Sequence, residues 1–448
     1  MPGRIVTLGG EGFPPDWIQI GYSTTPVSVI RGFNRAIELR DYYNENQPHV
    51  LDHDGDLSIV YFPKNADTSE LISAEAGLKD CTALEYIDIT LPATCGNFKE
   101  MFDGCTGLKD AKINLESGNP AININYLFNN CMSLDNVDID ISVLSALEEL
   151  RFMFYNCVSL KNITISNANA EDLIDAFNGC IGLLSCNVTI NKAWKADRAF
   201  KDAGDETGSD CTFNVNLGDT STICSYQNIF ESANMKSDSI VHLDHGVYFN
   251  EAFKNAKVNG YIHSTKREGA YTPDHTSCFK GAFVHGRLSL IENDDHNLGD
   301  ATSMFEDAYV YIGETSEMKP LNCNSMFKNA HFEPGAEYGS GEYCLQVITS
   351  QAEDFTEMFA GSNIKSMNHG IVPNLNNATT LTDMFANTSI TNTSFMNRFL
   401  LRLANATAYT GTKTLAHLGF TSDNYSTATI QAMSNYSTFT AAGWSIGY

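Results

Sequence analysis

The sequence predicts a solenoid, a fold in which short repeats stack along one axis, and two observations lead to this prediction. A phenylalanine followed two residues later by Gly, Asn, Asp or Ser, and then at once by a small residue, occurs twelve times at intervals of 22 to 32 residues. In the best-formed repeats, apolar residues then alternate with polar ones, as in a strand with one buried face. A unit this short cannot bury its apolar face alone and must stack on its neighbours.

Each repeat is expected to begin with a turn. Within Met101–Leu108, the apolar residues Phe102, Cys105 and Leu108 are three apart, which predicts a short helical or 3₁₀ turn with all three side chains directed inward. The residue two after each Phe is mostly of a type that tolerates a left-handed backbone, so we expect it to end the turn. The predicted buried ladder includes Phe102, Cys105, Phe128, Cys131, Phe154, Cys157, Phe177, Cys180, Phe253, Ala256, Phe305 and Ala308.

A short strand follows the turn and is expected to join a parallel sheet. Val137–Ile141 and Ile163–Ile165 show the alternation of apolar and polar residues most clearly. In the second half of the chain the apolar residue arrives one position sooner, as in Phe279–Val284. Because a slip of one residue would turn a strand inside out, we expect two kinds of repeat, first with Cys and then with Ala at the small position. A degenerate unit at Leu78–Leu84 brings the expected number to about thirteen.

The two ends of the chain fall outside the repeat pattern and are interpreted as caps. Residues 1–70 are predicted to form an N-terminal cap, with an amphipathic helix at about 26–43 and a strand near Leu57–Phe62. The repeats are expected to occupy residues 71–392. Residues 393–448 are predicted to form a helical C-terminal cap, with helices near 395–402 and 422–433 and a closing strand at 441–446.

Composition narrows the possible partners. The formal net charge of −26 repels phosphate backbones and anionic lipid headgroups, so we expect no nucleic-acid partner and no membrane insertion. The N-terminus lacks the apolar core of a secretory signal, and no apolar run reaches the length of a membrane span.

The twelve cysteines are expected to fill space in the core rather than to bind metal or take part in redox reactions. Cys81, Cys105, Cys131, Cys157 and Cys180 occupy the small position of successive repeats, and Ala, Ser or Thr replaces them in later ones. This exchange indicates a requirement for small size. With no Cys-x-x-Cys pair and no His at zinc-ligand spacing, we expect reduced, buried thiols and neither a metal nor a cofactor. Disulfide pairing is the alternative.

No catalytic residues are predicted. Neither Gly-x-Ser-x-Gly nor His-Glu-x-x-His occurs, and no set of potential catalytic groups converges. The carboxylates of Asp138 and Asp140 lie at alternate positions of one predicted strand, which is typical of a hydrated sheet face.

A candidate binding face is predicted from the outward positions of the strands. In the first half these positions carry short polar residues, whereas later ones carry residue types that are enriched at recognition surfaces. Simple coverage of neighbouring strands by these side chains is the alternative. The candidate residues are His242, Tyr261, His263, Arg287, Tyr309 and Tyr311.

The run Met-Phe-x-x-Cys-x-x-Leu, seen at Met101–Leu108 and Met153–Leu160, resembles the BspA-like leucine-rich repeats of bacterial surface proteins and of proteins from phages that infect gut bacteria. The opening segment Trp17–Pro26 and the closing segment Ala441–Ile446 resemble the ends of phage-encoded members. The resemblance implies a leucine-rich repeat solenoid used for adhesion or virion structure, without enzymatic activity.

Three functions follow from these expectations. The first is a virion structural or attachment protein, associated with a phage tail or capsid, assembled in the host cytoplasm, that binds other virion proteins or a host surface protein or glycan and can form homo-oligomers. The second is a bacterial cell-surface adhesin. The third is a virion-borne polysaccharide depolymerase, which would need a pair of carboxylates at glycosidase separation.

Overall fold

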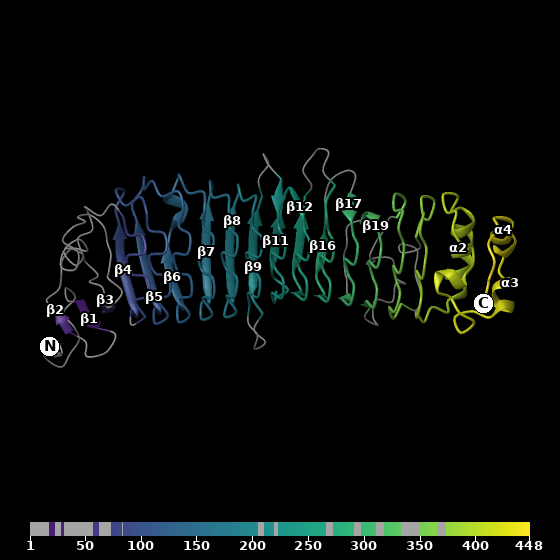
Figure 1. The fold of residues 1–448 in the computed structure, drawn as a ribbon, viewed down its shortest axis with the longest axis horizontal. Helices are drawn as coiled ribbons and strands as arrows, with labels where there is room; N and C mark the ends of the chain where they lie inside the picture. Colours follow the sequence, from purple (N-terminus) through teal and green to yellow (C-terminus); the bar gives the residue numbers. More distant parts are fainter. Residues whose placement is uncertain are drawn as a thin grey trace. The chain divides into compact units, whose positions relative to one another are not determined.

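The computed structural model of the chain is a parallel β-solenoid with little helix (Figure 1). The chain divides into two compact units, Met1–Asp219 (unit 1) and Thr220–Tyr448 (unit 2). The structure describes residues 18–22, 28–30, 57–61, 73–82, 84–204, 210–218, 223–265, 272–290, 297–310, 318–332, 349–364 and 373–448.

In unit 1, most coils contain one strand. The strands Tyr86–Leu91, Asp110–Leu115 and Asn136–Ile139 pair in parallel and in register, so that Ile87, Ala111 and Val137 share one level of their sheet. The strands Asn162–Asn167, Ser185–Ile190 and Thr212–Leu217 do the same in a second sheet, with Ile163, Cys186 and Phe213 at one level. The elements are β1 (Ile18–Tyr22), β2 (Ser28–Ile30), β3 (Leu57–Tyr61), β4 (Tyr86–Leu91), β5 (Asp110–Leu115), β6 (Asn136–Ile139), the 3₁₀ helix η1 (Ile141–Val143), β7 (Asn162–Asn167), β8 (Ser185–Ile190) and β9 (Thr212–Leu217).

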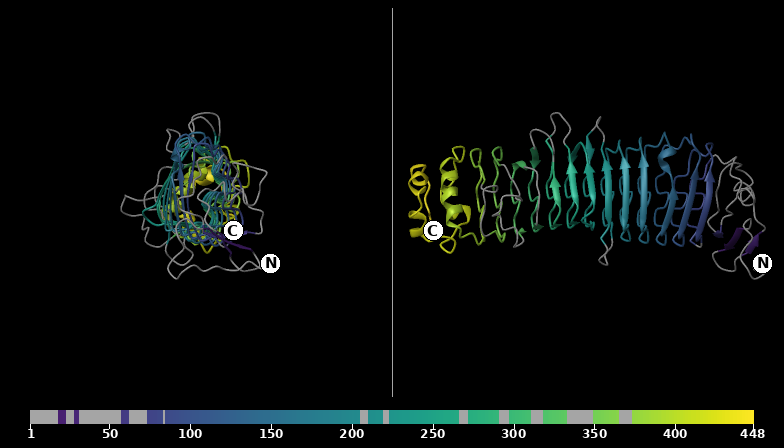
Figure 2. Two further views of the ribbon diagram at one scale, coloured as in Figure 1. Left: turned by 90° about the vertical axis from the view of Figure 1, so that its left-hand side faces the viewer. Right: turned by 180° about the vertical axis from the view of Figure 1, so that it is seen from behind.

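Unit 2 continues the same plan with shorter strands and ends in helices (Figure 2). Its elements are β10 (Cys224–Ser225), β11 (Ile240–Leu243), β12 (Gly246–Tyr248), β13 (Lys257–Val258), β14 (Tyr261–Ser264), β15 (Phe283–Val284), β16 (Arg287–Ser289), β17 (Asn297–Asp300), β18 (Tyr309–Val310), β19 (Lys319–Asn322), β20 (His331–Phe332), α2 (Thr393–Ala404), η2 (Ala416–Leu418), α3 (Thr427–Gln431) and α4 (Tyr436–Ala441).

The predicted phenylalanine ladder forms in both units. In unit 1, from Phe102 to Phe200, stacked rings follow one another at 5.2 to 5.5 Å between centroids. In unit 2, from Phe230 to Phe385, the spacing is 5.0 to 5.5 Å. These rings are buried, as are the small residues beside them. Stacked aromatic pairs add about 0.5–1.5 kcal/mol each to the stabilisation from burial. The ladder is therefore a continuous dry column inside each unit.

The turns are not helical, which corrects the prediction of a helical or 3₁₀ turn. Every turn-ending residue named by the pattern, from Gly104 to Asn387, has a positive φ of 54° to 77°. A second positive-φ residue lies two positions before each Phe, such as Glu100 before Phe102. This alternation sends every second N–H to the next coil, for example from Phe102 to the Leu127 carbonyl at 3.0 Å. A helix would instead use these donors within its own turn.

The two expected kinds of coil are present. In unit 1, Leu108 N donates to the Cys105 carbonyl at 3.0 Å, which closes a further turn before the strand. In unit 2 the residues directly after the small position instead pair with the next coil, which forms the extra parallel ladder β13-β15-β18-β20. A tight corner then leads to the main strand. A Cβ on Gly286 would lie 2.0 Å from the Gly260 carbonyl oxygen, so stacked corners require glycine.

The described part of the chain forms about nine complete coils, fewer than the expected thirteen. Stacked turns occur at each repeated Phe, but a complete coil also needs a strand. Residues 362–364 and 388–392, which follow the last two turns, form no strand. The predicted domain limits at 70, 71, 392 and 393 stay predictions, and the boundary between the two compact units lies inside the expected repeat array.

The elements predicted near the two chain ends are found in part, and their role as caps stays a prediction. Strand β3 lies where a strand is expected, but β2 occupies the beginning of the expected helix at 26–43 and pairs antiparallel with β1. The rest of that helix lies outside the described residues. Helices α2 and α3 lie within or close to their expected ranges. The strand predicted at 441–446 is reduced to a single bridge: α4 ends at Ala441, and Ser445 pairs in parallel with Thr414.

The C-terminal helices cover the end of the phenylalanine ladder. Asn392 caps α2, accepting a hydrogen bond from Phe395 N at 2.9 Å. Phe395 and Phe399 then meet the last ladder ring, Phe385, edge-on at 5.9 and 5.2 Å. Phe420 adds one more ring to the column, stacked on Phe385 at 4.9 Å.

Candidate binding surface

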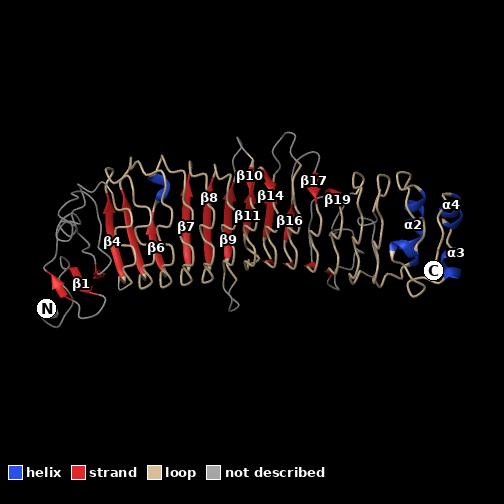
Figure 3. Cartoon of the chain, viewed as in Figure 1, coloured by secondary structure: helices blue, strands red, loops and turns tan. Residues whose placement is uncertain are grey.

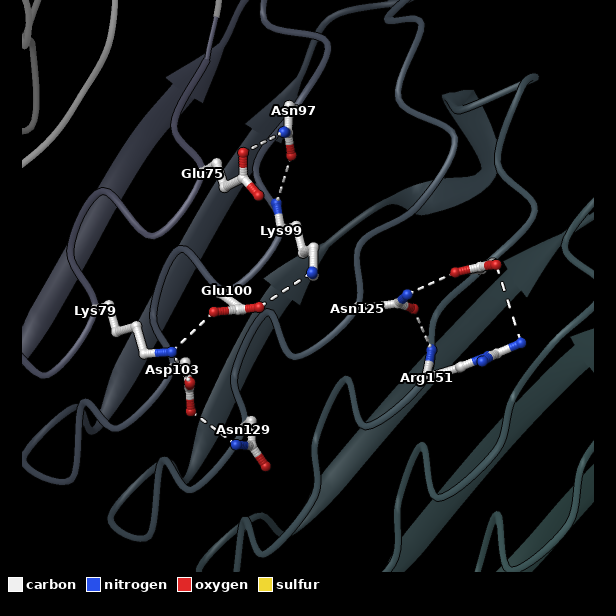
Figure 4. A network of polar contacts seen from close by, with 10 residues as sticks. Glu75, Lys79, Asn97, Lys99, Glu100, Asp103, Asn125, Asn129 and Arg151 are labelled. Atoms are coloured by element: carbon white, nitrogen blue, oxygen red, sulfur yellow. Dashed lines mark hydrogen bonds and ion pairs between the residues drawn. The ribbon is translucent and has the colours of Figure 1, made fainter.

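A polar network links neighbouring turns on the surface of unit 1 (Figure 4). Lys79 Nζ lies 2.8 Å from both Glu100 and Asp103 carboxylate oxygens, in the next coil. Hydrogen bonds from Lys79 to Asp103 and then Glu100 raise the pKa of the ammonium well above its ordinary value. The lysine holds the pKa of Glu100 below its usual range, against the opposing effect of burial. All three groups are partly exposed, so each pair contributes little to stability.

A second group of polar contacts surrounds Arg151. The Arg151 guanidinium lies 2.7 Å from the buried carboxylate of Asp172. Asn125 Nδ2 donates to Glu149 at 2.7 Å, and Asn125 Oδ1 accepts from Arg151 N at 2.7 Å (Figure 4). Each contact joins one coil to the next. These charged side chains link neighbouring coils.

Four of the six predicted binding residues converge on the outer face of unit 2. His242 on β11 and His263 on β14 are register partners, with ring centroids 4.9 Å apart. Tyr261 on β14 pairs with Arg287 on β16, and the guanidinium lies 5.0 Å from the tyrosine ring centroid. The Tyr261 hydroxyl lies 3.3 Å from His263 Nδ1. We call these four residues the imidazole–tyrosine patch.

The electrostatics of the patch suit recognition of a polar partner. Arg287 is exposed, and the other three side chains are half-buried. A guanidinium above a tyrosine at an exposed site gains about 0.5–1 kcal/mol and becomes pre-oriented. The patch thus presents a cation, a hydroxyl and two imidazoles on a rigid parallel sheet.

The structure separates Tyr309 from this patch. Tyr309 lies on β18 in the extra ladder, where Phe283 and His331 flank it at centroid distances of 6.3 and 5.0 Å. Phe283 is 36% exposed and Tyr309 51% exposed. We call Phe283, Tyr309 and His331 the aromatic stripe. Tyr311 lies outside the described residues.

Sequence reasoning missed Phe283 and His331. Each directly follows the small residue of its repeat, as Tyr309 follows Ala308. The register of the extra ladder aligns these positions, with Phe283 opposite Tyr309 and Tyr309 opposite His331. The residue directly after the small residue is therefore the sequence signal for the aromatic stripe. It can be recognised only once the extra ladder is known, because the ladder aligns these positions.

The cysteines form a column of thiols. The eleven cysteines within the described residues are buried and form no disulfide there. Cys131, Cys157 and Cys180 each donate from Sγ to the carbonyl of the ladder Phe one coil back, at 3.0 to 3.1 Å. Burial raises the pKa of these thiols, that of Cys180 to about 12. Such thiols are inert, and the thiol hydrogen bond adds to the size requirement inferred from the sequence.

Over the part of the chain that the structure describes, no three His, Cys, Asp or Glu side chains are grouped so as to hold a metal ion. No described helix has the length and apolar character needed to cross a membrane. His275 is fully buried, its Nδ1 lies 2.7 Å from the Leu298 carbonyl oxygen, and burial lowers its pKa to about 4, as expected of a packed structural imidazole.

Comparison with known proteins identifies the repeats. Residues 75–204 match the model of the BspA type leucine rich repeat region in six copies. No curated protein and no solved structure matches the chain. Leucine-rich repeat solenoids typically serve as binding scaffolds rather than enzymes, and they generally mediate protein or surface binding. Residues 75–204 are therefore identified as six BspA-type leucine-rich repeats.

Proposed function

We propose that the chain is a non-enzymatic virion protein, a structural or attachment component of a phage tail or capsid, that binds a protein or glycan through the outer surface of unit 2. The imidazole–tyrosine patch carries the binding part of this proposal. Tyr and Arg are enriched where interfaces gain most of their energy, and here they are held on a rigid sheet. The virion part is supported by the resemblance of the repeats and chain ends to phage-encoded proteins.

Rigidity favours attachment over catalysis. The patch strands are joined by four and three register pairs, and their inward residues Val241, Ile262 and Leu288 are buried. A surface held in this way loses little conformational entropy when a partner binds. We infer that the partner is another virion protein or a host surface protein or glycan, and that virion assembly takes place in the host cytoplasm.

Removal of the patch side chains tests the binding role. We expect the double variant Tyr261→Ala and Arg287→Ala to weaken binding to host cells by about thirtyfold or more, since one side chain of hot-spot type already contributes about 2 kcal/mol. The measurement is retention of fluorescently labelled protein on host cells, with unfolding temperature recorded in parallel. Tyr248→Ala is the control, because Tyr248 is an exposed tyrosine on β12, outside the patch. Equal binding by the double variant and the control would rule out the patch.

Location tests the virion role separately. Mass spectrometry of purified virions and of host surface fractions should find the chain in the virions. Its presence only in the host surface fraction would support the adhesin instead. Release of reducing ends from host capsule by the purified chain would support the depolymerase and contradict a non-enzymatic role.

A further inference from the structure

The parallel sheet of unit 1 is interrupted between β6 and β7 (Figure 3). Strand β6 ends one sheet and β7 begins another, although both pair fully on their other side. On the turn side the same two coils stay joined, with Asn130 N donating to the Tyr155 carbonyl at 2.8 Å. The coils therefore separate only along their strands.

A groove opens at this interruption. Its volume is about 400 Å³, within the range of small-molecule sites. Val137, Ile139 and Ile163 lie along it, with Asp138, Thr164 and Ser166 beside them. Val137 points inward but is half-exposed, whereas Ile163, at the matching position of β7, is only 3% exposed. The groove thus has an apolar floor and a polar rim.

The groove is closed at both ends. At one end Lys161 N lies 3.4 Å from the Asp135 carbonyl oxygen. At the other, Asn167 Nδ2 donates to the Ile141 carbonyl at 2.7 Å. An extended peptide lying along the strands could not continue past either end. A compact ligand fits this shape, and a strand-like one does not.

The rim offers both donors and acceptors. Asp138 is 74% exposed and lies 3.4 Å from Lys112, while Asp140 accepts hydrogen bonds from both the N–H and the hydroxyl of Ser142. Each carboxylate thus already has one partner in the chain, and its remaining oxygen lone pairs can accept hydrogen bonds from a ligand. Hydroxyls at Thr164 and Ser166 can donate or accept. Backbone groups of β6 and β7 that face the interruption make no strand pairing with each other.

We propose that the groove between β6 and β7 binds one neutral sugar residue of a glycan. A sugar ring has an apolar C–H face for the floor of Val137 and Ile163, and hydroxyls that donate to Asp138 and accept from Thr164. The net charge of −26 and the rim carboxylates act against an anionic ligand. This site is on unit 1 and is independent of the imidazole–tyrosine patch.

The test uses defined sugars as probes. Methyl glycosides of glucose, galactose, mannose and N-acetylglucosamine are titrated singly into the full chain, with binding followed by saturation-transfer NMR. We expect saturable binding of at least one of them. The double variant Asp138→Ala and Thr164→Val should weaken that binding by about tenfold, the effect of losing about 1.4 kcal/mol of hydrogen bonding.

The control variants lie on strands away from the interruption. Asp88 flanks Lys112 from the opposite side, in register on β4, and Thr189 is an exposed outward threonine of β8. The double variant Asp88→Ala and Thr189→Val should bind as the unaltered chain does. A peptide of the β5 sequence, Ala-Lys-Ile-Asn-Leu, tests the competing occupant. Failure of all four sugars, equal loss in the control, or binding of the peptide in the groove would overturn the proposal.

Discussion

Left-handed backbone positions recur twice in each coil, two residues before and two residues after the buried Phe. The later position is Gly, Asn, Asp or Ser throughout, types that reach this region at low cost. The earlier position also holds bulky residues, including Tyr126 and Phe152, whose rings stack at 4.7 Å. Stacking between coils thus accompanies a conformation that is unfavourable for an aromatic residue alone.

Crowding between coils differs among the glycines that have a positive φ. A Cβ on Gly179 would lie 2.4 Å from Asn156 Oδ1 in the preceding coil, whereas a Cβ on Gly118 would meet nothing within 4 Å. Both glycines have a positive φ. We expect Gly118→Ala to lower the free energy of unfolding by about 1 kcal/mol, the cost of the left-handed backbone alone.

Gly179→Ala should cost more, about 2 kcal/mol, because the flexible Asn156 side chain must also move away from the added Cβ. Chemical denaturation of the two variants and the unaltered chain measures both values. Equal losses would show that contact between coils adds nothing at Gly179.

At the scale of the elements, the buried thiols should make the stability of the chain depend on pH. Burial keeps Cys157 and Cys180 protonated in the folded chain, with the pKa of Cys180 raised to about 12. In the unfolded chain a thiol ionises near pH 8.5. A raised folded pKa gives stability that is complete below the unfolded pKa and is lost as pH rises through the folded one.

We therefore expect the free energy of unfolding to fall as pH rises from about 8.5 toward 12, in part because of these thiols. The double variant Cys157→Ala and Cys180→Ala should show a shallower decline over pH 8 to 10.5, measured by denaturation at each pH, despite lower stability at pH 8. Lysine ion pairs weaken in the same direction but remain in both proteins, so the difference isolates the thiols. Parallel declines would contradict the assignment.

At the scale of the whole molecule, a solenoid is stabilised by contacts between neighbouring coils. Phe279 stacks on Phe253 at 5.0 Å and on Phe305 at 5.2 Å. We expect Phe279→Ala to cost about 3–5 kcal/mol and to lower hydrogen-exchange protection most in the coils of Phe253 and Phe305. Helix α2, at the end of unit 2, should change least.

Hydrogen exchange of the same unit with Phe283→Ala provides the control. Phe283 belongs to the same coil but is partly exposed, so its loss should change stability by about 0.5 kcal/mol or less. Uniform loss of protection from β11 to α2 in Phe279→Ala would show that unit 2 unfolds as one cooperative block.

The repeated Phe, the small residue and the turn-ending Gly or Asn determined the solenoid, the buried ladder and the two kinds of coil, because each feature depends on local spacing and side-chain size. Predictions that depended on pairing between coils were less complete. The helical turn was wrong because alternate N–H groups of residues such as Phe102 bond to the next coil. Four binding candidates came together because equivalent outward positions share one register.

Only the tertiary structure decided the rest. It placed Tyr309 on the extra ladder with Phe283, and it separated β6 from β7 although Val137–Ile139 and Ile163–Ile165 have the same alternation in sequence. Side-chain period determines which face of a strand is buried, and this is local. Whether two strands pair depends on the path of both coils between them, which no single repeat encodes.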